Sequence, residues 1–194
     1  MADPYRVAFE FGGCPKVRGI RRDLGLGWMT PLASVRSSFA PGFFVMPQSL
    51  SCVYAHVVFS TKDRRPFLQD EQLSEDLFAY QSGICKGAGC PAVVIGGHID
   101  HVHLLVRLSR TTTIADLLRD LKRDSSAWVK SRGVRTFAWQ GGYGVFSISP
   151  AHVAAISEYI RHQEEHHQTV SFQDEFRTLC RKYGLGIDER YVWD

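Results

Sequence analysis

Long hydrophobic runs are absent from this chain of 194 residues. No stretch reaches the roughly 18 apolar residues that a membrane-spanning helix needs, so we expect no membrane partner. Paired cysteine motifs are absent too, because the five cysteines form an odd set without a Cys-x-x-Cys spacing. This pattern indicates neither a zinc ribbon nor a disulfide framework, and it favours reduced thiols in a cytoplasmic protein.

The chain also lacks a strong charge of one sign, a glycine-rich phosphate loop and a Gly-x-Ser-x-Gly elbow. Its formal net charge is +3, and residues 1–45 hold six of the basic and three of the acidic side chains, which leaves seventeen of each in the remainder. Any contact to a nucleic acid must therefore come from local basic clusters. The basic residues that could make such contacts are Arg64, Arg65, Lys122 and Arg123.

Length and composition predict one domain with one core, because 194 residues that are 44% hydrophobic are too few for two domains of average size. Residues 1–45 carry scattered arginines, glycines and prolines without periodicity, and they lack the apolar core of a signal peptide. We expect them to form a poorly ordered extension, with Met46 as a candidate for the natural start of the protein. Residues 46–194 are expected to form the functional domain.

Apolar patterns within residues 46–194 predict the element order β-α-β-β-α-β-α. Strands are expected at residues 52–60, 91–99, 101–108 and 143–148, and helices at residues 70–86, 113–133 and 149–167. Gly96 and Gly97 allow either a hairpin between the second and third strands or a bulge. The order predicts an α+β domain of ferredoxin-like or RRM-like type, with helices on one face of an antiparallel sheet and the other face free to meet a ligand. The apolar tail from Phe172 to Asp194 should pack on the domain or on a partner subunit.

Two histidines in the third predicted strand, His101 and His103, point to the same side of it, because side chains alternate along a strand. Their Cα atoms are expected about 6.5 to 7 Å apart, a spacing from which two imidazoles can converge on one divalent metal ion. Val102 and Leu104 point the other way, toward the expected core. The histidines should therefore lie on the free face, although a hydrogen-bonded pair without a metal is the simpler alternative.

The last predicted helix has Ser149 as a plausible N-cap and Pro150 at its first position, and it is expected to continue without interruption to about His167. An apolar stripe would pack this C-terminal helix on the sheet. Tyr159 and Gln163 are four residues apart and would stand on one flank of that stripe. The helix would thus present a phenol and an amide oxygen at its edge.

The order of these motifs, His101-Val102-His103 in a strand and then Tyr159-x-x-x-Gln163 in a late helix, resembles the single-tyrosine HUH transposases of the smallest bacterial insertion sequences and their REP-associated relatives. Asp100 just before the histidines fits the same family. The resemblance extends over about residues 47–194. It implies a DNA transposase that cleaves and rejoins single-stranded DNA, with Tyr159 as the nucleophile and a 5′-phosphotyrosine intermediate.

The resemblance also implies a cofactor and partners. A divalent metal ion, Mg²⁺ or Mn²⁺, would be held by His101, His103 and Gln163. The substrate would be a single-stranded DNA hairpin at each end of a mobile element. Family members work as homodimers, and the tyrosine helix completes the site of its own subunit or that of the partner, an alternative that the sequence leaves open.

Several alternatives within the site stay open at this point. His167 lies one turn beyond Gln163 on a similar helix face and could replace or assist it, whereas His162 falls away from it. Tyr159 could instead be a structural tyrosine. The chain could also be a domesticated or inactive protein that binds single-stranded nucleic acid, or a metal-dependent hydrolase with Asp100 as its base.

Overall fold

The computed structural model of the protein describes residues 49–193. The extension predicted for residues 1–45 lies outside the described residues. Within the part of the chain that is described, no helix combines the length and the apolar character needed to cross a membrane.

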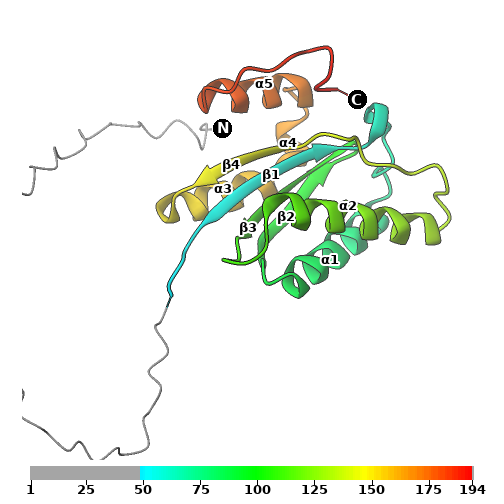
Figure 1. The fold of residues 1–194 in the computed structure, drawn as a ribbon. Coiled ribbons are helices and arrows are strands. Elements are labelled where there is room, and N and C mark those ends of the chain that lie inside the picture. The colour runs from blue at the N-terminus through cyan, green and yellow to red at the C-terminus, as the bar shows by residue number, and fades with distance from the viewer. Residues whose placement is uncertain (1–48, 194) are drawn as a thin grey trace, which may run out of the picture. The chain divides into compact units, whose positions relative to one another are not determined.

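Four strands form one antiparallel sheet with the order β2-β3-β1-β4 (Figure 1). The strands are β1 (Tyr54–Ser60), β2 (Ala92–His98), β3 (His101–Arg107) and β4 (Gly144–Ile148). Helix α1 (Glu71–Gly87) connects β1 to β2, and helix α2 (Ile114–Ser131) connects β3 to β4. A short 3-10 turn, η1 (Lys62–Arg64), follows β1. This topology is the ferredoxin-like α+β arrangement, and it confirms the predicted fold class.

Both connecting helices begin at a side-chain cap. Asp70 accepts a hydrogen bond from the backbone N–H of Leu73 at the start of α1, and Thr113 Oγ1 accepts one from the N–H of Asp116 at the start of α2. Such caps satisfy N–H groups that have no partner inside the helix. The local sequence therefore fixes where these two helices start.

The face of the sheet that α1 and α2 cover is apolar, and we call it the apolar face. Strand β3 contributes Val102, Leu104 and Val106 to it, all fully buried. They pack against leucines of both helices, namely Leu77 of α1 and Leu117, Leu118 and Leu121 of α2. This cluster is the main hydrophobic core of the described residues.

The opposite face, expected to be free, is covered by C-terminal helices (Figure 1), so that expectation is wrong. We call it the histidine face. The covering helices are α3 (Val153–Arg161), α4 (Gln163–His166) and α5 (Phe172–Lys182). Two of them pack on the strands with their apolar residues: Ile156 and Ile160 of α3 against Leu105, and Phe172 and Phe176 of α5 against Phe146. The tail from Phe172 thus packs on the domain because its own apolar stripe needs burial.

The last predicted helix is interrupted, which corrects the expectation of one continuous helix. A 3-10 turn, η2 (Pro150–His152), precedes α3, and His162 separates α3 from α4. Two successive side chains make hydrogen bonds to backbone carbonyl oxygens four residues earlier in the chain. His162 Nδ1 lies 2.8 Å from the Glu158 oxygen, and Gln163 Nε2 lies 3.3 Å from the Tyr159 oxygen. Side chains that compete with the backbone for these carbonyls bend a helix.

Gly96 lets α3 approach the sheet closely. Strands β2 and β3 form a hairpin with His98 opposite His101, and the register shift lies between Ala92 and Val94, so the glycines do not mark a bulge. A Cβ at Gly96 would lie 2.5 Å from the carbonyl oxygen of Ile160. A residue with a side chain would therefore push α3 away from the strand that is paired with β3.

Candidate functional site

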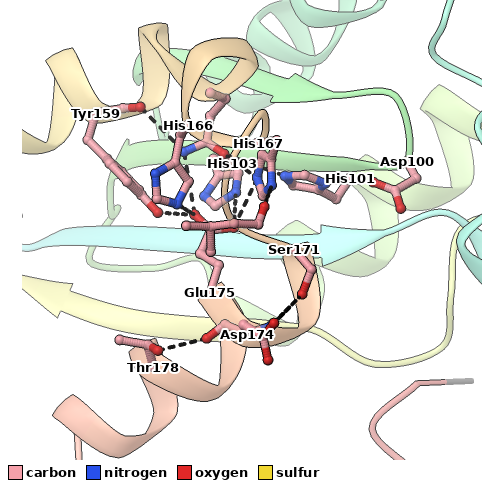
Figure 2. A network of polar contacts seen from close by, with 12 residues as sticks. Asp100, His101, His103, Tyr159, His166, His167, Ser171, Asp174, Glu175 and Thr178 are labelled. Carbon is pink, nitrogen blue, oxygen red and sulfur yellow. Dashed lines mark hydrogen bonds and ion pairs between the residues drawn. The ribbon is translucent and has the colours of Figure 1, made fainter. Parts of the chain in front are cut away.

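The histidine pair of β3 lies where its alternation predicts, on the side away from the apolar face. His101 and His103 point toward α3, α4 and α5, and both are fully buried (Figure 2). Their rings lie 5.1 Å apart between centroids. In the sheet, Ser60 and Val58 of β1 are opposite them. The two imidazoles therefore converge in a space that water does not reach.

Tyr159 and Gln163 reach the histidine pair within the same chain. The Tyr159 ring is 6.0 Å from the His103 ring, and Gln163 Oε1 is 3.5 Å from His101 Nε2. The helix break at His162 turns the Gln163 side chain inward, where it is buried. A phenol and an amide oxygen from the C-terminal helices thus meet an imidazole pair from the sheet.

His167 joins the cluster from the end of α4. Its Nε2 is 3.0 Å from Gln163 Oε1, and its Nδ1 is 2.8 Å from the carbonyl oxygen of Val170. His166 lies beside Tyr159, with 5.3 Å between the ring centroids. His162 is exposed and hydrogen-bonds the backbone of its own helix. The structure therefore brings both Gln163 and His167 to the histidine pair and leaves His162 outside.

Glu175 of α5 is one of two residues that sequence reasoning missed. Its side chain is buried on the inner side of the helix, where its Oε1 accepts a hydrogen bond from the Tyr159 hydroxyl. Its Oε2 is 3.5 Å from His103 Nε2 and 3.3 Å from His167 Nε2. Figure 2 shows the carboxylate between the phenol and the imidazoles. Glu175 thus links the tyrosine to the histidine cluster.

The proton positions on two of the imidazoles follow from their outer partners. His101 Nδ1 is 2.8 Å from Asp100 Oδ1, and a carboxylate only accepts, so Nδ1 carries the proton and Nε2 presents a lone pair. His167 Nδ1 donates to the Val170 carbonyl oxygen, which likewise leaves a lone pair on Nε2. A carboxylate behind a histidine is the arrangement that orients metal-binding imidazoles.

The ligand atoms of the cluster fit a divalent cation. One atom each of His101, His103, His167 and Glu175 lie within 4.8 Å of one another. Gln163 donates from Nε2 to the Tyr159 carbonyl oxygen, so its Oε1 turns toward the imidazoles. His101 Nε2, His167 Nε2 and Gln163 Oε1 then present lone pairs to one another, and a cation is what such a set of donors binds.

Burial sets the protonation of the cluster. It lowers the pKa of His103 well below its ordinary value, helped by the charges of His101 and His166, and it lowers the pKa of His167 to about 3. Burial also raises the pKa of Glu175 to about 7. At neutral pH, His103 and His167 are therefore neutral, which is the state in which a histidine binds a metal.

Asp100 is held in its charged form outside the cluster. Burial alone would raise its pKa, but the hydrogen bonds and charges of His101 and Arg64 outweigh burial and lower the pKa to about 2. Arg64 Nη2 lies 2.8 Å from Asp100 Oδ2. Both carboxylate oxygens are thus occupied, one by the imidazole and one by the guanidinium.

The four predicted DNA-binding residues differ in their exposure to solvent and in their partners. Arg64 pairs with Asp100, and Arg65 lies 3.5 Å from Asp63 and is 58% exposed. Arg123 pairs with two aspartates of α2 and is 62% exposed. Lys122 Nζ donates to the carbonyl oxygens of residues 140–142 and lies 4.8 Å from the centre of the Phe59 ring. Burial lowers the pKa of this lysine to about 8.

Two signals in the sequence could have revealed the missed residues. Glu175 falls three residues after Phe172 and four before Leu179, so it sits on the apolar stripe of its helix, where an acid is unusual. His56 alternates with Val57 in β1 and therefore faces the same side as the histidine pair. Its Nε2 is 2.9 Å from His103 Nδ1, which makes it the outer partner of that imidazole.

Comparison with known proteins places the chain in a family. None of the curated proteins matches it. A solved structure described as a transposase from Deinococcus radiodurans R1 is similar at 25% identity, with 61% of this chain and 98% of that chain covered and a TM-score of 0.49. A REP-associated tyrosine transposase bound to a REP hairpin is similar at 14% identity, with 76% of this chain and 94% of that chain covered and a TM-score of 0.48.

A family model described as "Transposase IS200 like" matches residues 49–163. The matched segment includes the histidine pair, Tyr159 and Gln163, and it ends before His167 and Glu175. Because it spans more than half of the 194 residues, this chain belongs to the IS200-like transposase family.

Proposed function

We propose that this transposase cleaves and rejoins single-stranded DNA with Tyr159 as its nucleophile. The observation that carries the proposal is the convergence of the Tyr159 phenol, the His101 and His103 imidazoles and the Gln163 amide within one chain. Family membership supplies the reaction class, and this geometry supplies a nucleophile beside a set of metal ligands. A tyrosine with only a structural role would not need two imidazoles and an amide oxygen beside its hydroxyl.

The chemical step exchanges one phosphodiester bond for another. Tyr159 Oη loses its proton and attacks a DNA phosphorus, a P–O bond to the tyrosine forms, and the bond to the 3′ oxygen breaks. The 3′ oxygen takes up a proton and leaves as a hydroxyl, so the protein keeps a 5′-phosphotyrosine. A second 3′-hydroxyl can reverse the step and rejoin DNA without ATP, because the energy of the broken phosphodiester is retained.

Tyrosine needs help for this attack, since a phenol with an ordinary pKa near 10 is a weak nucleophile at neutral pH. We propose that His101, His103 and Gln163 hold a divalent cation, Mg²⁺ or Mn²⁺, which when bound would offset charge on the phosphate oxygens. Asp100 holds the His101 ring with its Nε2 lone pair toward the site. Glu175 holds the Tyr159 hydroxyl next to the imidazoles.

The partners follow from the same proposal. The substrate is a single-stranded DNA hairpin at the end of a mobile element, and the protein acts as a homodimer in the bacterial cytoplasm. Arg64, Arg65, Lys122 and Arg123 are proposed to contact the DNA backbone by charge. Arg65 and Arg123 are the more exposed of these four and are expected to contribute most.

A covalent adduct tests the proposal. The protein is incubated with a labelled single-stranded hairpin and MnCl₂ or MgCl₂, and the products are separated on a denaturing gel. We expect a labelled protein band that Tyr159→Phe and metal chelation abolish. Tyr143→Phe is the matched control, because this tyrosine is 44% exposed and lies outside the cluster, and it should leave the band unchanged.

The other outcomes identify the alternative functions. DNA binding without an adduct, from a protein that is folded and loaded with metal, would favour a nucleic-acid-binding protein that has lost its chemistry. Cleavage without an adduct would favour a metal-dependent hydrolase. An adduct that survives Tyr159→Phe would contradict the assignment of the nucleophile.

A further inference from the structure

The buried carboxylate of Glu175 has one oxygen with a partner and one without. Its Oε1 accepts the hydrogen bond of the Tyr159 hydroxyl. Among the residues that the structure describes, its Oε2 makes no hydrogen bond, and neither does the buried Nε2 of His103, which lies 3.5 Å away. Buried polar atoms almost always have a partner, so two unpartnered atoms that face each other require an explanation.

A shared cation accounts for this pair. His167 Nδ1 lies 2.8 Å from the Val170 carbonyl oxygen, and when Nδ1 donates there, the lone pair of Nε2 faces Glu175 Oε2 at 3.3 Å and offers it no proton. When the Glu175 carboxyl is ionised, its buried oxygen faces this lone pair at a cost in free energy, and a positive ion between the two atoms replaces the repulsion with two bonds.

The distances suit one ion. With metal–ligand bonds of about 2.1 Å, neighbouring ligand atoms of an octahedral site lie roughly 3 Å apart and opposite ones roughly 4.2 Å apart. The atoms of His101, His103, His167 and Glu175 all lie within 4.8 Å of one another. Small side-chain movements would bring them to bonding distance of a single ion.

We propose that Glu175 and His167 are metal ligands, and that they join His101, His103 and Gln163 in a site of three imidazoles, one amide oxygen and one carboxylate. This inference rests on the proposed function and sharpens it. Such a donor set suits transition-metal ions, whereas Mg²⁺ prefers oxygen ligands and keeps several waters. The site therefore takes Mn²⁺ in preference to Mg²⁺, and binds ions later in the first transition row more tightly still.

Two of these proposed ligands lie beyond the segment that matches the family. The family match ends at residue 163, whereas His167 follows α4 and Glu175 belongs to α5. The helix that covers the histidine face thus completes the site with a carboxylate. Because Glu175 contacts Tyr159 with one oxygen and the ion with the other, it holds the nucleophile at a fixed place beside the metal.

Metal binding by the full chain tests this assignment without any measurement of activity. Protein stripped with EDTA and dialysed is titrated with MnCl₂ or MgCl₂ in a calorimeter, and the free Mn²⁺ signal is followed by electron paramagnetic resonance. We expect one Mn²⁺ per chain, bound at least about tenfold more tightly than Mg²⁺. Glu175→Gln should weaken Mn²⁺ binding by about 10-fold to 100-fold, since even the loss of a group that only orients a metal ligand has an effect of this size.

The control is the same substitution at an exposed position of α4, Glu164→Gln, which should bind Mn²⁺ like the wild type. Circular dichroism in EDTA checks that each variant is folded. If Glu175→Gln does not fold, His167→Gln tests the same site from another element and should also weaken Mn²⁺ binding. Wild-type affinity for Mn²⁺ in a folded Glu175→Gln protein, or in His167→Gln where the first variant is unfolded, would overturn the assignment.

Failure of this inference and failure of the proposed function give different results. If Glu175→Gln binds Mn²⁺ normally while Tyr159→Phe still abolishes the DNA adduct, the ligand assignment is wrong and the strand-transfer function stands. If Mn²⁺ binding depends on Glu175 but the wild-type protein forms no adduct, the metal site stands and the function is wrong.

Discussion

The two faces of strand β3 are equally buried but differ in chemistry. On the apolar face, Val102 and Leu104 pack among leucines of α1 and α2 and leave no polar atom to satisfy. On the histidine face, His101 and His103 are just as inaccessible, yet His103 Nε2 has no hydrogen-bond partner among the described residues. Burial on the first face stabilises the fold, whereas burial on the second holds lone pairs in place for a ligand.

The largest expected effect comes from damage to the apolar face. Leu104→Ala removes a fully buried side chain and leaves a cavity, so we expect the free energy of unfolding to fall by about 2–5 kcal/mol. Urea unfolding in EDTA measures this change.

On the histidine face, Glu175→Gln should lower the free energy of unfolding far less than Leu104→Ala does, because it removes a buried charge with an unpartnered oxygen. If both variants lost the same free energy of unfolding, the view that the apolar face stabilises the fold more than the histidine face would be contradicted.

A smaller effect is expected where α3 meets the sheet. Gly96→Ala places a Cβ 2.5 Å from the Ile160 carbonyl oxygen, so α3 must move, at a cost of about 1–3 kcal/mol in unfolding free energy. Because α3 carries Tyr159, the yield of the DNA adduct should fall as well. Thermal unfolding and the denaturing gel measure the two effects.

The matched control for Gly96 is Gly83→Ala in α1. A Cβ there meets nothing within 4 Å, and alanine favours a helix over glycine, so stability should rise by about 0.5–1 kcal/mol with the adduct unchanged. If Gly96→Ala behaved like Gly83→Ala, the close approach of α3 to β2 would be contradicted.

The histidine face should also make the metal-free protein sensitive to acid. His56, His103 and His167 have lowered pKa values in the folded state, so below pH 6.5 the unfolded chain binds more protons than the folded protein and stability falls. Glu175, with its pKa raised to about 7, acts in the opposite direction, because the folded state takes up a proton there between pH 7 and 4.5.

Three imidazoles outweigh one carboxylate, so the unfolding free energy should fall by about 2 kcal/mol between pH 7.5 and pH 5.5. Urea unfolding in EDTA at the two pH values measures the difference. Glu175→Gln removes the opposing group and should make the loss larger. A stability that stays level over this range would mean that these imidazoles are not held neutral.

Most of the fold could be predicted from local sequence. Alternation along β3 placed His101 and His103 on one side and Val102 on the other, and the apolar pattern over residues 113–133 placed α2. These features depend on neighbouring residues alone, and the structure confirms them. The cover over the histidine face depends instead on the path of the chain after β4, which no local pattern specifies.

The candidate site was less predictable because its parts come from distant elements. Tyr159 and Gln163 could be found from their spacing, but the helix break at His162 has no proline or glycine to mark it. It arises from side chains that bond to backbone carbonyls, and it turns Gln163 inward. Glu175 lies beyond the family match and reaches the imidazoles only because α5 packs on the sheet.

Mapping the DNA-linked residue tests the central claim most directly. The wild-type protein is reacted with a single-stranded hairpin and MnCl₂, digested with trypsin and nuclease, and its peptides are sequenced by mass spectrometry. We predict a nucleotide attached through its 5′-phosphate to the peptide that contains Tyr159. A nucleotide on any other residue, or no modified peptide from protein that binds both Mn²⁺ and the hairpin, would contradict the account.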